Sequence, residues 1–169
     1  MALLLTGAPG VGKTTTIQKL ARAYSDKTLR GFVTQEMRRA GRRVGFEIRT
    51  FGGRKQVLAH VDLDSSHRVG RYGVDVAALD DITEDALTTD DAADLYLVDE
   101  IGKMECFSKS FRSALRALFA SGRPLVATVA LRGGGFIQEV KDRADVESWE
   151  ATKQNRNELP DLVVDRLRL

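Results

Sequence analysis

The segment GAPGVGKT, Gly7 to Thr14, constrains the fold of this chain more than any other stretch. It follows a short apolar run, ALLLT, and precedes KTTTIQKLARAY, in which Ile17, Leu20 and Tyr24 recur at helical spacing. A buried strand, a glycine-rich turn and a helix in this order are typical of a loop that binds phosphate. An ordinary glycine-rich turn would not require a lysine followed by a hydroxyl residue at its end.

Each residue type in the loop has a physical reason. The three glycines allow backbone conformations that other residues avoid, so that successive N–H groups can point at phosphate oxygens. Lys13 is expected to reach the β- and γ-phosphates, and the Thr14 hydroxyl is expected to bind Mg²⁺. The residues predicted to hold the nucleotide here are Gly7, Ala8, Pro9, Gly10, Val11, Gly12, Lys13, Thr14 and Thr15.

Strand and helix patterns alternate along the rest of the chain. Further predicted strands are RGFVTQEM, RVGFEIRTF, QVLAHVDL, DLYLVDE, PLVATV and VESWEAT. Helices are predicted from Asp80 to Ala93, in SKSFRSALRALFASG, in GFIQEVKDRA, and after a cap at Asn157. The alternation predicts one α/β domain over residues 1–169, a three-layer P-loop NTPase fold. We expect a mainly parallel sheet with helices on both faces and an added antiparallel β-hairpin, RVGFEIRTF with QVLAHVDL.

Two adjacent acids, Asp99 and Glu100, end the apolar strand DLYLVDE. Burying an unpaired carboxylate costs several kcal/mol, so the pair needs a partner. If this strand runs beside the first strand, Asp99 reaches the phosphate site and holds Mg²⁺ together with Thr14. Glu100 is then placed to accept a hydrogen bond from an attacking water and to take its proton. The alternative for Glu100 is a surface acid paired with Lys103 or an arginine.

Other segments leave two interpretations open. Lys103 either stabilises charge on the transferred phosphoryl group or holds its turn by pairing with Glu105. Asn155 and Arg156 follow the last predicted strand, where we expect contacts to the base, although a plain loop before a helix fits as well. Three arginines follow the second predicted strand and lie around the hairpin, where they either reach a phosphate or are solvated; these are Arg38, Arg42 and Arg43.

Composition limits the setting in which the chain works. The formal net charge of +2 decides little, and Cys106 is the only cysteine, so no internal disulfide forms. The N-terminus lacks the basic leader and the length of a signal peptide, and no apolar run approaches membrane-spanning length. We expect a cytoplasmic protein without a membrane partner.

The phosphate loop together with VDEIGKME resembles the nucleoside-triphosphatase family first described from thermophiles, which has a human cancer-related member. GFVTQEMRRAGRRVGFEI, RVGRYGVDV and ATKQNRNELP are similar to further segments of that family, in the same order along the chain. Gln35 and Cys106 depart from its usual residues, an acid and an aliphatic residue, and neither touches the loop or the acid pair. The resemblance implies a monomeric-sized enzyme that hydrolyses ATP, GTP and other nucleoside triphosphates to the diphosphate, slowly and with broad base tolerance. In it, Glu100 serves the water and Asp99 serves the metal.

Two other function classes remain to be compared with hydrolysis. A kinase would pass the γ-phosphate to a nucleotide, a metabolite or a polynucleotide end, with arginines gripping the acceptor. A nucleotide-dependent RNA-binding module would use the basic hairpin, but no aromatic residues are interleaved with its arginines, which disfavours a nucleic-acid partner. No arginine finger is assigned; the candidates are Arg132, Arg143 and Arg156.

Overall fold

A nine-stranded mixed sheet runs through the computed structural model, which describes every residue from Met1 to Leu169. The strand order across the sheet is β5-β6-β4-β3-β2-β7-β8-β1-β9. The strands are β1 (Ala2–Thr6), β2 (Leu29–Arg39), β3 (Arg42–Thr50), β4 (Lys55–His60), β5 (Arg68–Val69), β6 (Tyr72–Val74), β7 (Leu95–Ile101), β8 (Leu125–Val129) and β9 (Val146–Glu150). The helices are α1 (Lys13–Ala23), α2 (Val76–Leu87), α3 (Lys109–Ser121), α4 (Phe136–Lys141) and α5 (Leu159–Leu167), with a 3₁₀ turn at Glu105–Phe107.

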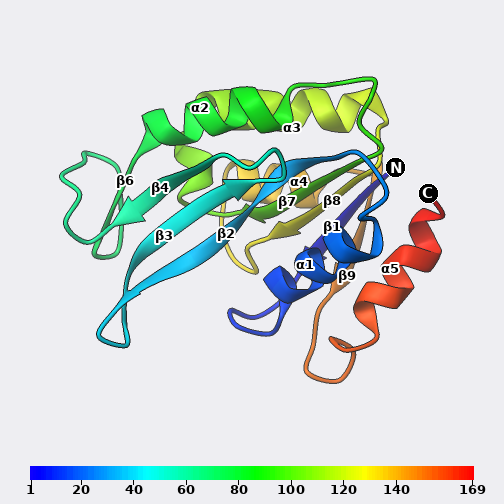
Figure 1. Ribbon diagram of the computed structural model, residues 1–169, viewed down its shortest axis with the longest axis horizontal. Coiled ribbons are helices and arrows are strands. Elements are labelled where there is room, and N and C mark those ends of the chain that lie inside the picture. The colour runs from blue at the N-terminus through cyan, green and yellow to red at the C-terminus, as the bar shows by residue number, and fades with distance from the viewer.

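The sheet has a parallel core and an antiparallel extension. Strands β2, β7, β8, β1 and β9 pair in parallel, and β2, β3, β4, β6 and β5 pair antiparallel. The β2–β3 hairpin projects beyond the rest of the sheet (Figure 1). The predicted α/β fold with an added hairpin is confirmed, while the short strands β5 and β6 were not predicted.

Strand β8 lies between β1 and β7, so the expectation that the acid-bearing strand runs directly beside the first strand was wrong. All three strands read as nearly continuous apolar runs because each is covered on both faces. Such runs do not encode which strand neighbours which. The carboxyl ends of β1, β8 and β7 nevertheless meet at one edge, because all three are parallel.

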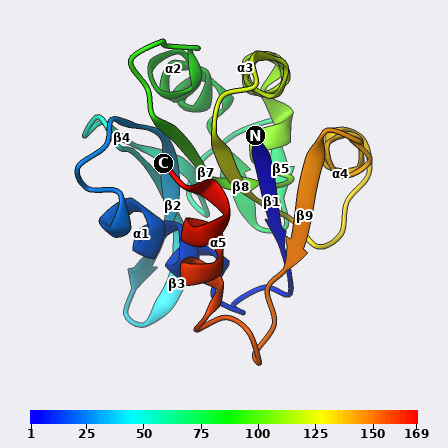
Figure 2. The same ribbon diagram turned by 90° about the vertical axis from the view of Figure 1, so that its right-hand side faces the viewer.

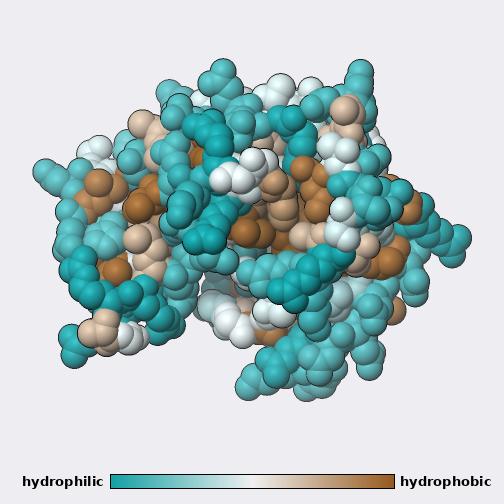
Figure 3. Space-filling view, in the orientation of Figure 1, coloured by the Kyte–Doolittle hydropathy of each residue, from teal (hydrophilic) through white to brown (hydrophobic).

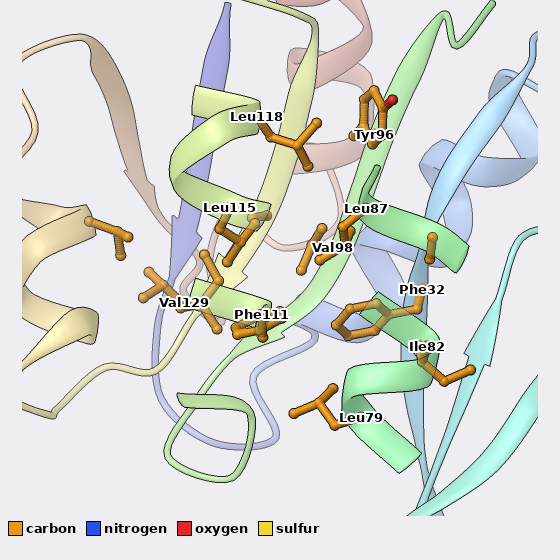
Figure 4. Close-up of a cluster of buried hydrophobic side chains, with 14 of the residues drawn as sticks. Phe32, Leu79, Ile82, Leu87, Tyr96, Val98, Phe111, Leu115, Leu118 and Val129 are labelled. Atoms are coloured by element: carbon orange, nitrogen blue, oxygen red, sulfur yellow. The ribbon is translucent and has the colours of Figure 1, made fainter. Parts of the chain in front are cut away.

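Helices cover both faces of the sheet (Figure 2). The larger apolar cluster packs α2, α3 and α4 on one face, and Figure 4 shows Phe32, Phe111 and Leu115 meeting at its centre. The smaller cluster packs α1 and α5 on the other face, with Ile17 and Val163 fully buried. The layers are therefore helix, sheet and helix, as predicted.

Two predicted helix starts were wrong. Asp75, not Asp80, caps α2, because its side chain accepts a hydrogen bond from the Ala78 N–H at 2.9 Å. The helix ends at Leu87 instead of continuing to Ala93. The closing helix α5 begins one residue later than the Asn157 cap predicts, after Glu158.

The projecting hairpin is largely polar on the face shown in Figure 3. No helix combines the length and the apolar character needed to cross a lipid bilayer.

Candidate functional site

The phosphate loop joins β1 to α1 in a conformation that requires glycine. Gly7, Gly10 and Gly12 have φ values of 146°, 74° and 122°, in the region that side-chain-bearing residues avoid. A Cβ on Gly7 would lie 2.5 Å from the Ala151 carbonyl oxygen, so space as well as backbone angle excludes other residues there. The loop is thus held between its own helix and the segment that follows β9.

Lys13 lies at the centre of this loop and is almost fully buried, with 9% of its surface exposed. Its ammonium group donates hydrogen bonds to the Gly7 carbonyl oxygen at 3.0 Å and to the Ala8 carbonyl oxygen at 3.5 Å. Its Nζ is 3.9 Å from the Glu100 Oε2. A buried cation is therefore aimed at the space between the loop and the acid pair.

Asp99 joins the phosphate loop to the acid-bearing strand. Its Oδ2 accepts a hydrogen bond from the Thr14 hydroxyl at 2.7 Å, across 85 positions of sequence. Its Oδ1 accepts one from the Thr128 hydroxyl at 2.6 Å, and its backbone carbonyl accepts one from the Thr34 hydroxyl at 2.5 Å. Burial raises the pKa of the Asp99 carboxyl, and the bonds from Thr128 and Thr14 oppose this shift. The partners of this buried acid are hydroxyl groups on three different elements.

Thr34 and Thr128 are contacts that sequence reasoning missed. Each ends up beside Asp99 because β2 and β8 flank β7 in the sheet. The only sequence signal was a hydroxyl residue inside a predicted strand, near the carboxyl end of β8 for Thr128 and in the middle of β2 for Thr34. This signal carries little weight until the strand order is known.

The oxygen atoms of Asp99 and its neighbour Thr14 suit a hard cation that also binds phosphate. No group of three or more His, Cys, Asp or Glu residues is arranged to hold a metal ion by itself. Mg²⁺ typically binds one or two protein oxygens and completes its octahedral shell with substrate phosphates and water. One carboxylate and one adjacent hydroxyl, those of Asp99 and Thr14, match this requirement.

Glu100 and Lys103 line the same cavity as the loop. Burial raises the pKa of the Glu100 carboxyl and the charge of Lys13 opposes it. Glu100 forms its ion pair with Lys13, not with Lys103 or an arginine. Lys103 is exposed and forms no ion pair, including none with Glu105. Lys103 is therefore unpaired in the cavity, whereas Glu100 is paired with Lys13.

Glu105 is a second buried acid of the site that sequence reasoning did not assign. Only 4% of its surface is exposed, and burial raises its pKa to about 8, with Glu100 and Asp99 adding to the shift. Gly102 lies between the two acids: a Cβ on it would be 2.8 Å from the Glu105 Oε2 and 3.0 Å from the Glu100 Oε1. The absence of a side chain at Gly102 lets the two carboxyl groups approach each other.

The cavity at this edge has a volume of about 970 Å³ and extends well past the phosphate loop. One end is formed by the loop, Asp99 and Glu100. The other end is formed by residues of β2, β3, β4 and β6 and the β5–β6 turn, among them Phe46, Leu58 and Tyr72. Of Arg38, Arg42 and Arg43, only Arg43 lines the cavity. Arg38 and Arg43 both form ion pairs with Glu36, which also lines it.

Asn155 and Arg156 lie on the opposite side of the loop from this cavity extension. The Asn155 Oδ1 accepts a hydrogen bond from the Thr152 N–H at 2.8 Å, and its Nδ2 donates one to the Glu150 carbonyl oxygen at 2.8 Å. Arg156 is exposed, and its Cδ would lie 3.8 Å from a Cβ on Gly12. Asn155 thus fixes its own loop, and Arg156 lies beside the phosphate loop.

Comparison with known proteins agrees with this geometry. The sequence model of the family described as NTPase matches residues 2–164. Nucleoside-triphosphatase THEP1 of Thermotoga sp. (strain RQ2) is 41% identical over 169 residues, which cover 99% of this chain and 96% of that protein. The human cancer-related nucleoside-triphosphatase is 36% identical over 178 residues, which cover 95% of this chain and 94% of that protein.

A solved structure extends the likeness to three dimensions. The crystal structure of THEP1 from the hyperthermophile Aquifex aeolicus superposes with a TM-score of 0.87 at 32% identity and covers 100% of both chains. The sequence matches and the structural superposition indicate the same family. The chain belongs to the nucleoside-triphosphatase family that includes these proteins.

Proposed function

We propose that the protein hydrolyses ATP, GTP and other nucleoside triphosphates to the diphosphate and phosphate, with Mg²⁺ as cofactor. The observation that carries this proposal is the 2.7 Å hydrogen bond between Thr14 and Asp99, which brings the phosphate loop and the acid pair to one point. Glu100 follows Asp99 directly and lines the cavity there. Membership of the nucleoside-triphosphatase family supports the same activity.

The loop binds and orients the triphosphate. Its backbone N–H groups and the N-terminus of α1 face the phosphate oxygens, and Lys13 neutralises charge on the β- and γ-phosphates. Thr14 and Asp99 hold Mg²⁺, which supplies further neutralisation of the charge on these oxygens when bound. Phosphoryl transfer needs little else from a protein, because its catalysis is mostly positioning and electrostatic stabilisation.

Glu100 supplies the step that makes the reaction a hydrolysis. Its carboxylate accepts a hydrogen bond from a water, orients the water oxygen toward the γ-phosphorus and takes its proton. Burial raises the pKa of this carboxyl, and the Lys13 ammonium, 3.9 Å away, opposes that shift and so favours the ionised form. Lys103 lines the cavity and stabilises charge on the transferred group.

Broad base tolerance follows from the loop after β9. The side-chain amide of Asn155 is already used on both sides within that loop, so it shapes the base site without reading hydrogen bonds of the base. Arg156 contacts the base or ribose with a side chain that suits any nucleotide. A site without a dedicated polar partner discriminates weakly between bases.

The positions of the candidate arginines and the solvent exposure of Glu100 both support slow turnover. Arg143 pairs with Asp145, and Arg156 lies beside Gly12. Arg132 lines the cavity but is exposed and has no ion-pair partner, so no arginine is held in place at the γ-phosphate. About a third of the Glu100 side chain, 36%, remains exposed, so water is incompletely excluded. We expect a kcat well below about 10 s⁻¹, the median for enzymes.

Phosphate release from purified protein with ATP, GTP, CTP and UTP tests the proposal, comparing the wild type with Glu100→Gln. Loss of a general base typically costs about 10²-fold to 10⁴-fold in rate, so we expect a kcat lower by that factor with unchanged nucleotide affinity. Glu84→Gln, on the exposed face of α2, is the matched control and should behave as the wild type. Unchanged hydrolysis in Glu100→Gln would remove Glu100 from the mechanism, and no release from any nucleotide would refute the function.

A further inference from the structure

The proposed hydrolysis uses no residue from the end of the cavity that lies away from the phosphate loop. We call it the distal lobe and define it by its lining side chains, Glu36, Arg43, Phe46, Leu58, Val69 and Tyr72. Strands β2, β3, β4 and β6 lie on the far side of β7 from β1. The distal lobe therefore lies on the far side of β7 from the phosphate loop.

In-line chemistry places the lobe on the attacking side of the γ-phosphate. The attacking and leaving oxygens lie on opposite sides of the phosphorus in phosphoryl transfer. With the γ-phosphate between Lys13 and Glu100, the attacking group comes from the side of Glu100. The β-phosphate, ribose and base of the triphosphate then extend the other way, toward Arg156 and the loop after β9. The substrate's own base does not fill the distal lobe.

The floor of the lobe suits a flat aromatic group. The Phe46 and Tyr72 rings lie edge to face with centroids 5.3 Å apart. The Arg43 guanidinium lies over both rings, 5.2 Å from the Phe46 centroid and 5.8 Å from the Tyr72 centroid. Hydrogen bonds to the Tyr72 hydroxyl at 3.0 Å and to Glu36 at 2.9 Å fix it there, so its plane, backed by Phe46, is the stacking surface. Aromatic rings and guanidinium planes are the usual platforms for nucleic-acid bases.

Two cations that line the cavity suit an anion. Lys103 follows β7 and Arg132 follows β8, and both line the cavity. Both are exposed and neither forms an ion pair with an acid of the chain. Two free cations beside the γ-phosphate site and an aromatic floor farther out match a molecule with a phosphate at one end and a base at the other.

We propose that the distal lobe binds a nucleoside monophosphate, which accepts the γ-phosphoryl group in place of water. A non-bridging oxygen of the monophosphate forms a bond to the γ-phosphorus, and the bond from that phosphorus to the β–γ bridging oxygen breaks. The bridging oxygen keeps the electron pair, so one triphosphate and one monophosphate give two diphosphates. The phosphate oxygen is already ionised at neutral pH, and no proton has to move. This inference rests on the proposed triphosphate site.

The test supplies Mg²⁺ and ATP together with CMP or GMP and measures CDP or GDP and released phosphate by chromatography. We expect diphosphate to form and phosphate release to fall as the monophosphate concentration rises. Hydrolysis of ATP without any CDP or GDP would overturn the inference and leave the proposed hydrolase in place. Calorimetric titration of CMP and GMP into the protein alone tests the lobe even where no ATP turns over, and no binding there overturns the inference.

Two variants assign the acceptor to the lobe. Phe46→Ala removes the floor, and Val69→Trp fills the lobe from its rim. Loss of a stacking platform weakens binding between about 5-fold and 150-fold, so we expect the apparent affinity for CMP and GMP to fall by that factor in Phe46→Ala. Both variants should keep phosphate release from ATP alone. Val57→Ala is the control, because Val57 precedes Leu58 in β4 but is 39% exposed and does not line the cavity.

The same variants test the main alternative, in which the distal lobe binds the base of the triphosphate. If Phe46→Ala raises the KM for ATP in the absence of any monophosphate, the lobe holds the base of the triphosphate itself and the inference is wrong. Unchanged diphosphate formation in both folded variants would also overturn it. Unfolding midpoints of the two variants establish that each is folded.

Discussion

At the scale of single residues, the site concentrates acids whose ionisation depends on their surroundings. Glu105 is the extreme case, because it is buried beside Glu100 and forms no ion pair. Its carboxyl keeps its proton to a pKa of about 8, against an ordinary value of 4.5. The folded protein therefore holds a neutral acid here in the pH range where an unfolded chain would hold a carboxylate.

This difference predicts a pH-dependent stability that Glu105→Gln removes. The stabilising contribution of the protonated group is fully present below about pH 4.5 and is lost as the pH rises to about 8, because only the unfolded chain releases the proton in that range. We expect the unfolding free energy of the wild type, minus that of Glu105→Gln, to fall by an amount on the order of 3 kcal/mol over this range. Urea unfolding between pH 5 and pH 8.5 without nucleotide measures it, with Glu84→Gln as control. A difference that does not change with pH would contradict the prediction.

At the scale of elements, the pairing of β2 with β7 brings the antiparallel extension up to the site. Phe32 pairs with Val98 in this parallel ladder, two residues before Thr34 reaches the carbonyl oxygen of Asp99. The two strands approach closely at Gly31, where an added Cβ would lie 1.9 Å from the Leu97 carbonyl oxygen. Gly31 also has a φ of 104°, which other residues avoid.

Gly31→Ala is therefore expected to separate the two strands. We expect the unfolding free energy to fall by at least about 3 kcal/mol, because the methyl group has no space and the backbone angle is strained. Gly53→Ala provides the matched control: its φ is 92° but no atom lies within 4 Å of the added Cβ, so only the strain remains, at about 1 kcal/mol. Urea unfolding of both variants measures the two effects, and similar losses would show that the close approach is unimportant.

At the scale of the whole molecule, the site lies where the parallel strands end, between the two apolar clusters. Cluster residues on one face come from α2, α3 and α4, and those on the other from α1 and α5. Lys13 begins α1, and Asp99 is a buried residue of β7, two positions before its end. A ligand that joins these residues connects elements from different parts of the fold.

Binding of Mg²⁺ and ATP should accordingly stabilise the entire molecule. At a ligand concentration 100-fold above Kd the gain is about 2.7 kcal/mol, which corresponds to a Tm increase of roughly 5–10 °C for a chain of this size. We expect Lys13→Ala to lose this increase, and Lys19→Ala, on the exposed face of α1, to keep it. Differential scanning calorimetry measures both. An equal Tm increase in Lys13→Ala would exclude the lysine from phosphate binding.

The sequence was most informative where a function depends on residues close together in the chain. The loop glycines, Lys13 and Thr14 form one local motif, and the positive φ values at the glycines agree with it. The roles of Thr34 and Thr128 depend instead on β2 and β8 flanking β7, which apolar strands do not encode. The start of α2 was missed for a related reason: both Asp75 and Asp80 suit a cap, and packing against the core decides between them.

The position of β1 in the sheet also bears on how the protein is made. Among the strands of this sheet β1 is synthesised before the others, yet its two hydrogen-bonded neighbours, β8 and β9, begin only at Leu125 and Val146. During translation the leading apolar segment has no native neighbour until most of the chain has emerged. Pairing between segments so far apart in the sequence slows folding. The phosphate loop, which follows β1, is therefore one of the last features of the nascent chain to form.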